Sequence, residues 1–525
     1  MNVLSDGIYL IPEVVLLLGA CLTLIFGADQ RSPLAALVSP IAFIALLIGF
    51  LAALFLQPEA AIVAPLPGLM LNSLSHYTRL ITLGIGLAIV LVNWAQGSRA
   101  ERGEYMGLIL LSLMGVMLTA SANDLLILFF AIELVSVPTY VLIALSRDDS
   151  RAAEASVKYF FLGALSTAIL AYGMSFLYGM AGTTLLSTIQ DGVAYPVWPT
   201  GSEFNALAMA GLLLLIAGLA FKIAAVPFHV YAPDVYEGAA APITGMLGFV
   251  PKLAGFIAFA KVLSLMQWDL PGQLYWVLWL MAAASMTFGN VLALLQRNVK
   301  RMLAYSSVAH TGYMLVALLV GPVAGAGPMR DGLAALLFYI VVYGLMNLGA
   351  FTMLTAFSRK KGEEVETLDD LSGLSRTAPW ESFALAVCVF SLIGFPPTAG
   401  FLGKLYVFSS AFSLDTLHPF HGPVVALAII GVLNSAIGAA YYLKIVAAVY
   451  VREPVDPPEA AKGFPARLAL AMCAIPMIVL FLRPALIADA ARAATTSLRP
   501  PESETKLTES EGSTPVEGDV LASVE

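Results

Sequence analysis

Charged residues are scarce in this chain. They make up 12% of its 525 residues, whereas ordinary soluble domains contain about 25%, and hydrophobic residues make up 59%. A chain with so few charges cannot form the polar surface of a soluble protein, so the composition predicts a polytopic membrane protein. Its net charge is −8, and the last 26 residues alone hold seven acids and one lysine. The remaining body is close to neutral, which excludes a nucleic-acid partner.

The sequence also lacks the motifs of redox, nucleotide and metal sites. Its three cysteines, Cys21, Cys388 and Cys473, stand in separate apolar runs without a CxxC or Cys/His spacing. We interpret them as small buried hydrophobic residues. There is no GxGxxG motif after a strand, no Walker A loop and no haem-attachment motif. The sequence therefore predicts that this chain itself binds no cofactor and carries out no redox chemistry.

Fourteen apolar stretches are long enough to cross a bilayer, which takes about 20 residues each. The first basic residue is Arg31, so we interpret the first stretch as a spanning helix and not as a cleaved signal peptide. The tail at 500–525 is rich in Pro, Glu, Ser and Thr and is predicted to be disordered. The predicted helices of this all-α chain lie near residues 8–27, 34–56, 78–95, 105–121, 124–145, 157–182, 206–231, 241–267, 273–295, 302–321, 331–356, 381–410, 424–450 and 465–483.

Lysine and arginine are distributed unevenly between the loops. Loops after odd-numbered helices carry fifteen of them, whereas loops after even-numbered helices carry only Lys261 and Arg330. The positive-inside rule then places the odd-numbered loops in the cytoplasm. With fourteen helices both termini face the opposite side. We expect this side to be the periplasm, with the chain in a bacterial inner membrane.

Several ionisable side chains fall inside the predicted helices. An ionisable group at the centre of a spanning helix costs at least about 2.5 kcal/mol, and for this reason marks a candidate functional site. Glu133 lies nine residues after Asp124, which is roughly 13 Å into its helix. The other candidates are Lys158, Lys222, Lys252, His310 and Lys404.

Two of these candidates also have a structural interpretation. Lys158 follows Glu154 at i, i+4 near a helix start, which is a common surface ion pair, and its long side chain can reach the membrane interface. His310 can be a hydrogen-bonded histidine of the core. The sequence leaves both interpretations open.

Prolines interrupt two of the predicted helices next to these lysines. Pro227 leaves the carbonyl of Ile223 without its helical partner. The pair Pro396–Pro397 does the same to the carbonyls of Leu392 and Ile393. A broken helix beside a buried charge is how transporters place polar backbone at membrane depth.

The interrupted helices are the seventh and the twelfth. Because an odd offset of five helices reverses the orientation in the membrane, they fit two inverted five-helix repeats. The predicted segments are three N-terminal helices at 1–100, a first repeat at 101–270, a second repeat at 271–452, a last helix at 453–499 and the tail at 500–525.

The buried lysines permit proton movement. A free lysine has a pKa of about 10.4, which burial can lower by several units and a nearby carboxylate can raise again. Our hypothesis is that Glu133 holds Lys222 protonated. Loss of that contact would send the proton through water and Lys252 toward His310 and Lys404.

At these residues the sequence resembles the antiporter-like membrane subunits of respiratory complex I, the proton-translocating NADH:quinone oxidoreductase. The motifs span positions 12 to 408 and include PEVVLLLGA, ANDLLILFFAIELVSVPTYVLIAL, AEASVKYFFLGALSTAILAYG, FKIAAVPFHVYAPDVYEGAAAPIT, QRNVKRMLAYSSVAHTGYM and GFPPTAGFLGKLYVF. The resemblance implies a fourteen-helix fold with two inverted repeats. It also implies a proton path in which Glu133 pairs with Lys222, Lys158 and Lys252 act as relays, and Lys404 is the terminal residue.

The resemblance further implies partners and a source of energy. The resemblance implies that the complex uses FMN, iron–sulfur clusters and a quinone, all held outside this chain. The expected partners are the other membrane subunits of the complex, including neighbouring antiporter-like subunits, and membrane lipid. Lys404 stands where one sister subunit usually has glutamate, which argues against that sister. Two alternatives stay open. One is a subunit of a monovalent cation/proton antiporter, and the other is a scaffold bundle whose charges no longer conduct.

Overall fold

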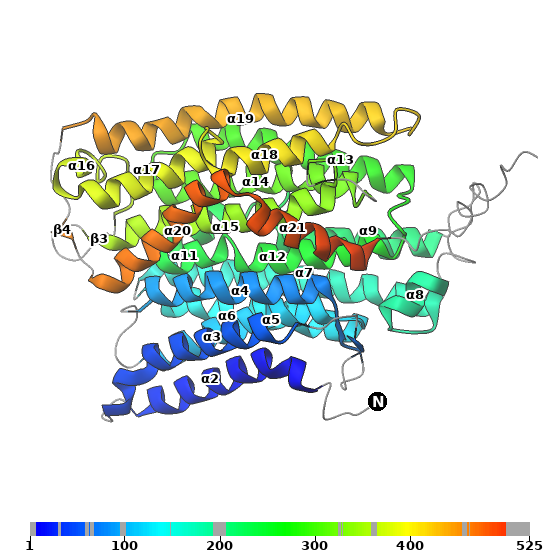
Figure 1. The fold of residues 1–525 in the computed structure, drawn as a ribbon, viewed down its shortest axis with the longest axis horizontal. Coiled ribbons are helices and arrows are strands. Elements are labelled where there is room, and N and C mark those ends of the chain that lie inside the picture. The colour runs from blue at the N-terminus through cyan, green and yellow to red at the C-terminus, as the bar shows by residue number, and fades with distance from the viewer. Residues whose placement is uncertain are drawn as a thin grey trace, which may run out of the picture.

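Long helices make up nearly all of the computed structural model, and they lie side by side along a common direction (Figure 1). The structure describes residues 7–29, 33–57, 62–63, 68–94, 101–147, 149–192, 206–323, 327, 329–358, 365–453, 459–460 and 463–499. The predicted disordered tail lies outside these residues.

Within the described residues, twelve helical segments are long and apolar enough to cross a membrane. Polar backbone groups cannot be left unpaired in hydrocarbon, and a continuous helix pairs them internally. These segments contain α2 (Ile11–Ala28), α3 (Val38–Phe55), α4 (Ser73–Val92), α5 (Arg102–Ser121), α6 (Leu125–Leu145), α7 (Ser150–Ala181), α11 (Ala241–Leu247) with α12 (Val250–Ser264), α13 (Gly272–Leu294), α14 (Val299–Val320), α15 (Gly332–Ala356), α19 (His421–Tyr450) and α20 (Phe464–Leu482).

The two remaining predicted crossings are the interrupted ones, and each is divided in the structure. The seventh, predicted at 206–231, forms α9 (Ala206–Lys222), and after the break the chain continues into α10 (Ala232–Gly238), which begins just beyond the predicted end. The twelfth forms α17 (Pro379–Ile393) and α18 (Ala399–Ser410). Eleven continuous crossings, the eighth crossing, which consists of α11 and α12, and the two divided ones make the fourteen expected from the sequence. The predicted fold class, an all-α membrane protein with broken helices seven and twelve, is confirmed.

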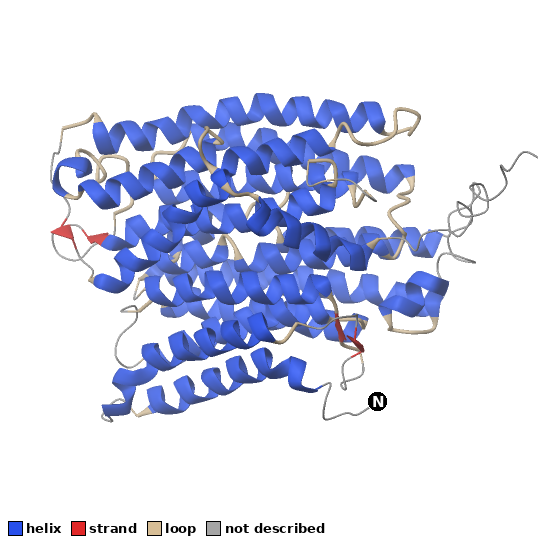
Figure 2. Cartoon of the chain, viewed as in Figure 1, coloured by secondary structure: helices blue, strands red, loops and turns tan. Residues whose placement is uncertain are grey.

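Loops of the same parity meet at the same end of the molecule. Arg147, in the loop after the fifth crossing, pairs with Glu366 in the loop after the eleventh. At the other end, Arg499, after the fourteenth crossing, pairs with Asp331, after the tenth. The two small sheets follow the same rule. Figure 2 shows β1–β2, which follows the second crossing, at the opposite end of the molecule from β3–β4, whose strands follow the eleventh and thirteenth crossings. This alternation supports the count of fourteen.

Some boundaries differ from the prediction. Helix α7 begins at Ser150, seven residues before the predicted start, because Asp149 caps it by accepting a hydrogen bond from the amide of Ala152. The eighth crossing is interrupted between α11 and α12 around Gly248. Lys261 was counted with the loop charges although it falls within the predicted helix at 241–267, and that count is wrong. It lies in α12, is buried, and donates to the carbonyl of Ala122.

The sequence prediction also missed the shorter elements. Helix α21 (Ala485–Thr495) follows the last crossing and packs on α4 and α15. The described chain further contains α8 (Leu186–Gly192), α16 (Leu374–Thr377), the 3-10 helices η1 (Gly7–Leu10), η2 (Pro33–Leu37) and η4 (Thr496–Leu498), and the strands β1 (Ile62–Val63), β2 (Met70–Leu71), β3 (Phe357–Ser358) and β4 (Glu459–Ala460).

Burial separates central from peripheral helices. Helices α14 and α15 are buried over almost their whole length, whereas α2, α3 and α7 leave rows of large apolar side chains exposed. Exposed apolar rows are expected where a helix faces lipid or another membrane subunit. Lys252, on α12, and Lys404, on α18, therefore lie against the most enclosed part of the bundle.

Candidate functional site

Lys222 and Glu133 form an ion pair inside the bundle. Lys222 is the last residue of α9 and is 6% exposed. Its Nζ lies 2.9 Å from Oε1 of Glu133, on α6, and 2.9 Å from Oγ of Ser136, one turn further along the same helix. Thr167 of α7 donates to the same carboxylate oxygen at 2.7 Å. Three helices thus supply the hydrogen bonds that a desolvated ion pair requires.

The break after Lys222 exposes backbone carbonyls, and side chains from other segments pair with them. Thr311 Oγ1, on α14, lies 2.8 Å from the Ile223 carbonyl, the group that Pro227 was expected to strand. The Tyr231 hydroxyl donates to the carbonyl of Phe221 at 2.8 Å. The polar backbone at this depth is thus satisfied by the protein itself.

Lys252, on α12, is held by neutral groups. It is 2% exposed, donates to the carbonyl of Ser307, and lies 2.7 Å from Thr311 Oγ1. Its Nζ is also 5.3 Å from the centre of the Tyr343 ring, within the range of a cation–π contact. Thr311 therefore links Lys252 to the Ile223 carbonyl at the first helix break.

A small cavity is lined by both Lys222 and Lys252. Its volume is about 10 Å³, and both lysines line it together with Tyr159, Tyr231 and Tyr236. A cavity needs roughly 10–15 Å³ and two to four polar partners to hold one water molecule. This space is therefore suited to a single water molecule next to both lysines.

His310, on α14, joins Lys252 to the second half of the molecule. The histidine is 1% exposed, with Nδ1 2.7 Å from the Tyr339 hydroxyl and Nε2 3.0 Å from the Tyr442 hydroxyl. Its ring centre is 4.9 Å from that of Tyr343 and 5.5 Å from that of Tyr313. Both ring nitrogens therefore have a hydroxyl partner.

Lys404, on α18, binds the second helix break directly. Its Nζ lies 3.0 Å from the carbonyl of Leu392 and 2.8 Å from that of Ile393, the two groups that Pro396–Pro397 was expected to strand. The Ser435 hydroxyl is 2.7 Å away. A Cβ on Gly394, which has a φ of +82°, would lie 2.8 Å from Cδ of Lys404, so glycine suits both the turn and the close approach.

Aromatic residues connect these groups into one row. Tyr343 contacts both Lys252 and His310. Tyr313 contacts both His310 and Lys404, whose Nζ is 5.1 Å from the centre of its ring. We call the five ionisable residues the central row: Glu133, Lys222, Lys252, His310 and Lys404.

The structure places Lys158 outside the central row. Its side chain is 44% exposed and pairs with Glu154 at 2.7 Å and with Asp234 at 3.0 Å. Arg301 pairs with Asp234 at 2.9 Å and with Glu237 at 2.7 Å. These residues line a polar cavity of about 240 Å³ at the end of the molecule where the odd-numbered loops meet. The surface pair that the sequence left open is present, and a relay role for Lys158 stays a prediction.

The sequence missed several polar residues of the site. The need for a hydrogen-bond donor could have been predicted, because the carbonyl stranded by Pro227 requires one, but the sequence does not show that Thr311 supplies it. The tyrosines had no such signal, since in sequence they are indistinguishable from core residues. A second buried ion pair, between Arg79 and Glu13 at 2.6 Å, lies in the three N-terminal helices and was also missed.

Comparison with known proteins places the chain in a family. The model of the family described as "NADH:quinone oxidoreductase/Mrp antiporter, TM" matches residues 122–431. NADH-quinone oxidoreductase subunit N of Rhodospirillum rubrum is 37% identical over 492 residues, which are 93% of this chain and 96% of the relative. The subunit N of Trichlorobacter lovleyi is 41% identical over 70% of this chain and 72% of its own length.

Solved structures agree with this assignment. A chain of respiratory complex I from Thermus thermophilus with bound aureothin is 29% identical, with a TM-score of 0.75 over 92% of this chain and 99% of that one. A chain of the Mrp complex from Dietzia sp. has a TM-score of 0.81 over 96% and 98% of the two chains, but at 22% identity it shows the fold alone. The described fold and the long matches lead to one conclusion: the chain is a multi-pass membrane protein that belongs to the family of NADH:quinone oxidoreductase and Mrp antiporter membrane subunits, and within it to the subunit N group.

Proposed function

We propose that this chain is a proton-translocating membrane subunit of an NADH:quinone oxidoreductase. It would act as part of a translocase, coupling NADH oxidation and quinone reduction elsewhere in the complex to proton movement through the membrane. The observation that carries this proposal is the central row, in which Lys222, Lys252, His310 and Lys404 are buried and Glu133 is largely enclosed. A core without function has no need of such a series, because each buried charge costs free energy unless it is paired.

The first step would take place at Glu133 and Lys222. While the carboxylate lies 2.9 Å from Nζ, it favours the protonated lysine. If the carboxylate moves away, Ser136 and Thr167 remain, and neutral hydroxyls in an apolar site stabilise an ammonium far less. Burial then favours the neutral amine. The proton would leave through the water-sized cavity toward Lys252.

The second step would pass from Lys252 to Lys404. Thr311 and the Ser307 carbonyl hold the Lys252 ammonium beside His310. The imidazole can accept a proton on one nitrogen and release it from the other, because each faces a tyrosine hydroxyl. Lys404 would receive the proton against the two carbonyls of the second break.

Proton uptake would occur from the polar cavity near Lys158. The cavity lies at the end that carries most of the basic loop residues, which is the expected cytoplasmic side. Within it, Asp234 and Glu237 flank Tyr236, whose hydroxyl is 3.2 Å from Ser307 Oγ. Through Ser307 this cavity approaches Lys252. The same orientation would place both termini in the periplasm.

The ends of the central row point to partner subunits. Glu133 lies on α6, and the Ser435 partner of Lys404 lies on α19, at the upper edge of Figure 1. The row therefore runs across the helices and not along them. This direction suits charge coupling to neighbouring antiporter-like subunits in one bacterial inner-membrane complex.

Redox-driven proton pumping in membrane vesicles would test the proposal. Lys222→Ala should abolish pumping and coupled quinone reduction while the complex still assembles. Lys261→Ala is the matched control, because Lys261 is an equally buried lysine that contacts the Ala122 carbonyl outside the central row. Unchanged pumping in an assembled Lys222→Ala complex, or an equal loss in both variants, would contradict the proposal.

The alternative function is sodium- or potassium-for-proton exchange, which the shared fold with the Mrp complex keeps open. Within the described residues, no group of three or more His, Cys, Asp or Glu side chains could hold a metal ion. The long matches at 37–41% identity are to subunit N proteins. Pumping that needs NADH and is unaffected by the replacement of sodium would favour the first function.

A further inference from the structure

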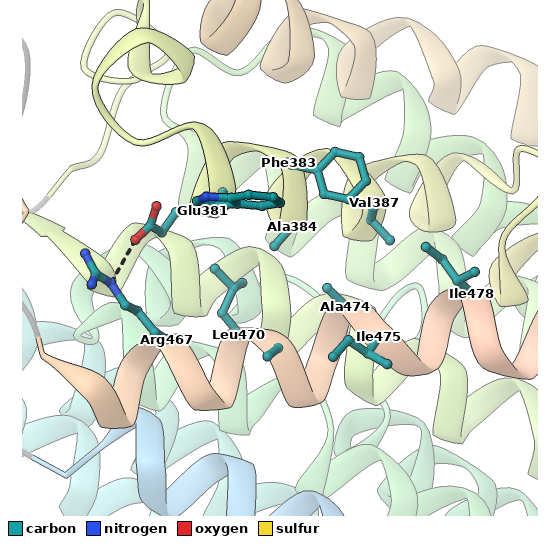
Figure 3. A pocket seen from close by; sticks show the side chains of 11 residues that line it. Glu381, Phe383, Ala384, Val387, Arg467, Leu470, Ala474, Ile475 and Ile478 are labelled. Carbon is teal, nitrogen blue, oxygen red and sulfur yellow. Dashed lines mark ion pairs between the residues drawn. The ribbon is translucent and has the colours of Figure 1, made fainter.

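An apolar groove lies between α17 and α20 on the outside of the bundle (Figure 3). Its volume is about 380 Å³. Among the described residues that line it, Arg467 and Glu381 are the charged ones, and they meet at the same end, with Arg467 Nε 2.9 Å from Glu381 Oε1. The groove is thus apolar along its length and carries one positive and one negative group at one end.

The dimensions of the groove match one leaflet of a bilayer. It follows α20 from Arg467 to Ile478, and these eleven residue steps span roughly 16 Å at 1.5 Å per residue. Half of a hydrocarbon core of about 30 Å is about 15 Å. Ala384, Ala471 and Ala474 line its centre, where their short side chains leave room between the helices. The groove therefore has the length of a single acyl chain.

The charged end lies where a membrane–water boundary is expected. Glu381 is in the first turn of α17, and Arg467 is in the first turn of α20, so both helices begin there. Trp380, beside them, is 81% exposed. Tryptophan is enriched at membrane interfaces, because its ring is apolar and its N–H is polar. The ion pair is therefore at headgroup level and the alanines are at acyl-chain level.

We propose that this groove binds a zwitterionic phospholipid whose headgroup carries a phosphate and a primary ammonium group. The ion pair uses Nε of Arg467, so its two Nη atoms can donate to the phosphate, which a guanidinium binds well. The second carboxylate oxygen of Glu381 can accept from the ammonium. A choline headgroup has no N–H to donate, and an anionic headgroup without an ammonium meets Glu381 as a like charge.

Photo-crosslinking in membranes that contain the assembled complex tests this site. The probes are phosphatidylethanolamine, phosphatidylcholine and phosphatidylglycerol analogues that carry a diazirine in the same acyl chain. Mass spectrometry measures the labelled fraction of α17 and α20. The reference is the part of α7 around Phe161, which is 66% exposed. The apolar groove that α7 forms with α6 lies further along the helix, at residues 171–178, and does not include Phe161.

We expect the ethanolamine analogue to label α17 and α20 about fivefold more than the other two, which corresponds to about 1 kcal/mol for a solvent-accessible ion pair. All three should label α7 equally. Glu381→Gln should remove the preference for ethanolamine over choline, and Arg467→Gln should lower labelling by all three analogues. Ala471→Phe should fill the groove and lower labelling of α17 and α20 while labelling of α7 is unchanged.

Three outcomes would overturn the proposal. Equal labelling by the three analogues, unchanged in Glu381→Gln, means ordinary boundary lipid. A preference for phosphatidylglycerol means a different headgroup chemistry. Labelling of α7 without labelling of α17 and α20 means that another subunit covers the groove. If the Ala471→Phe complex does not assemble, Glu381→Gln and Arg467→Gln still test the proposal, because both side chains lie at the surface end of the groove.

Discussion

The two divided helices solve the same physical problem with different chemistry. At the first break, Lys222 turns away from the freed carbonyls and pairs with the Glu133 carboxylate, while Thr311 pairs with the Ile223 carbonyl. At the second break, Lys404 itself binds the freed carbonyls of Leu392 and Ile393. A carboxylate has a full charge that can be moved away, whereas backbone carbonyls are fixed dipoles. The proposed mechanism therefore assigns the switching step to Lys222 and the receiving step to Lys404.

The largest loss of proton pumping is expected from a substitution at Glu133, the charged partner at the first break. Glu133→Gln keeps the size and the hydrogen bond from Thr167 but removes the charge that pairs with Lys222. Loss of one partner of a buried pair costs about 3–5 kcal/mol, so proton pumping should fall at least tenfold, which corresponds to about 1.4 kcal/mol. The measurement is NADH-driven acidification of inverted vesicles. Asp369→Asn, in the exposed ion pair with Arg452, should pump normally. Full pumping in Glu133→Gln would show that the charge is not needed.

An intermediate effect is expected at Thr311. Thr311→Val removes the hydroxyl that contacts both the Ile223 carbonyl and Lys252, and an unpaired buried carbonyl costs about 1–3 kcal/mol. We expect pumping per NADH oxidised to fall about three- to fivefold in an assembled complex. Thr352→Val is the control, because this buried threonine donates only within its own helix, to the carbonyl of Leu348. Equal effects of the two variants would mean that Thr311 merely fills space.

The smallest effect is expected at the second break. Ser435→Ala removes one of three partners of Lys404 and leaves both carbonyls in place. One hydrogen bond contributes about 0.5–1.5 kcal/mol, so pumping should fall less than threefold. Ser410→Ala, a buried serine that donates to the Val407 carbonyl of its own helix, serves as the control. A loss as large as that in Glu133→Gln would mean that the two breaks work alike.

The sequence predicted the structure most accurately where a residue type has a single physical consequence. Pro227 and Pro396–Pro397 predicted both breaks and the freed carbonyls, because proline has no N–H wherever it lies. Boundaries were less certain. The start of α7 was placed seven residues late, since the polar residues of its first turns look like a loop. Lys261 was counted with the loop charges although it is buried, because the sequence does not show whether a lysine near a helix end reaches water.

The sequence by itself determined the membrane class, the fourteen crossings, the two breaks and the residues of the central row. These follow from composition, helix length and proline chemistry, all of which are local. The tertiary structure alone decided how those residues meet. It put Thr311 between Lys252 and the first break, Tyr343 and Tyr313 on either side of His310, and Lys158 in a polar cavity apart from the row. Such contacts join segments far apart in the chain, and helix packing sets them.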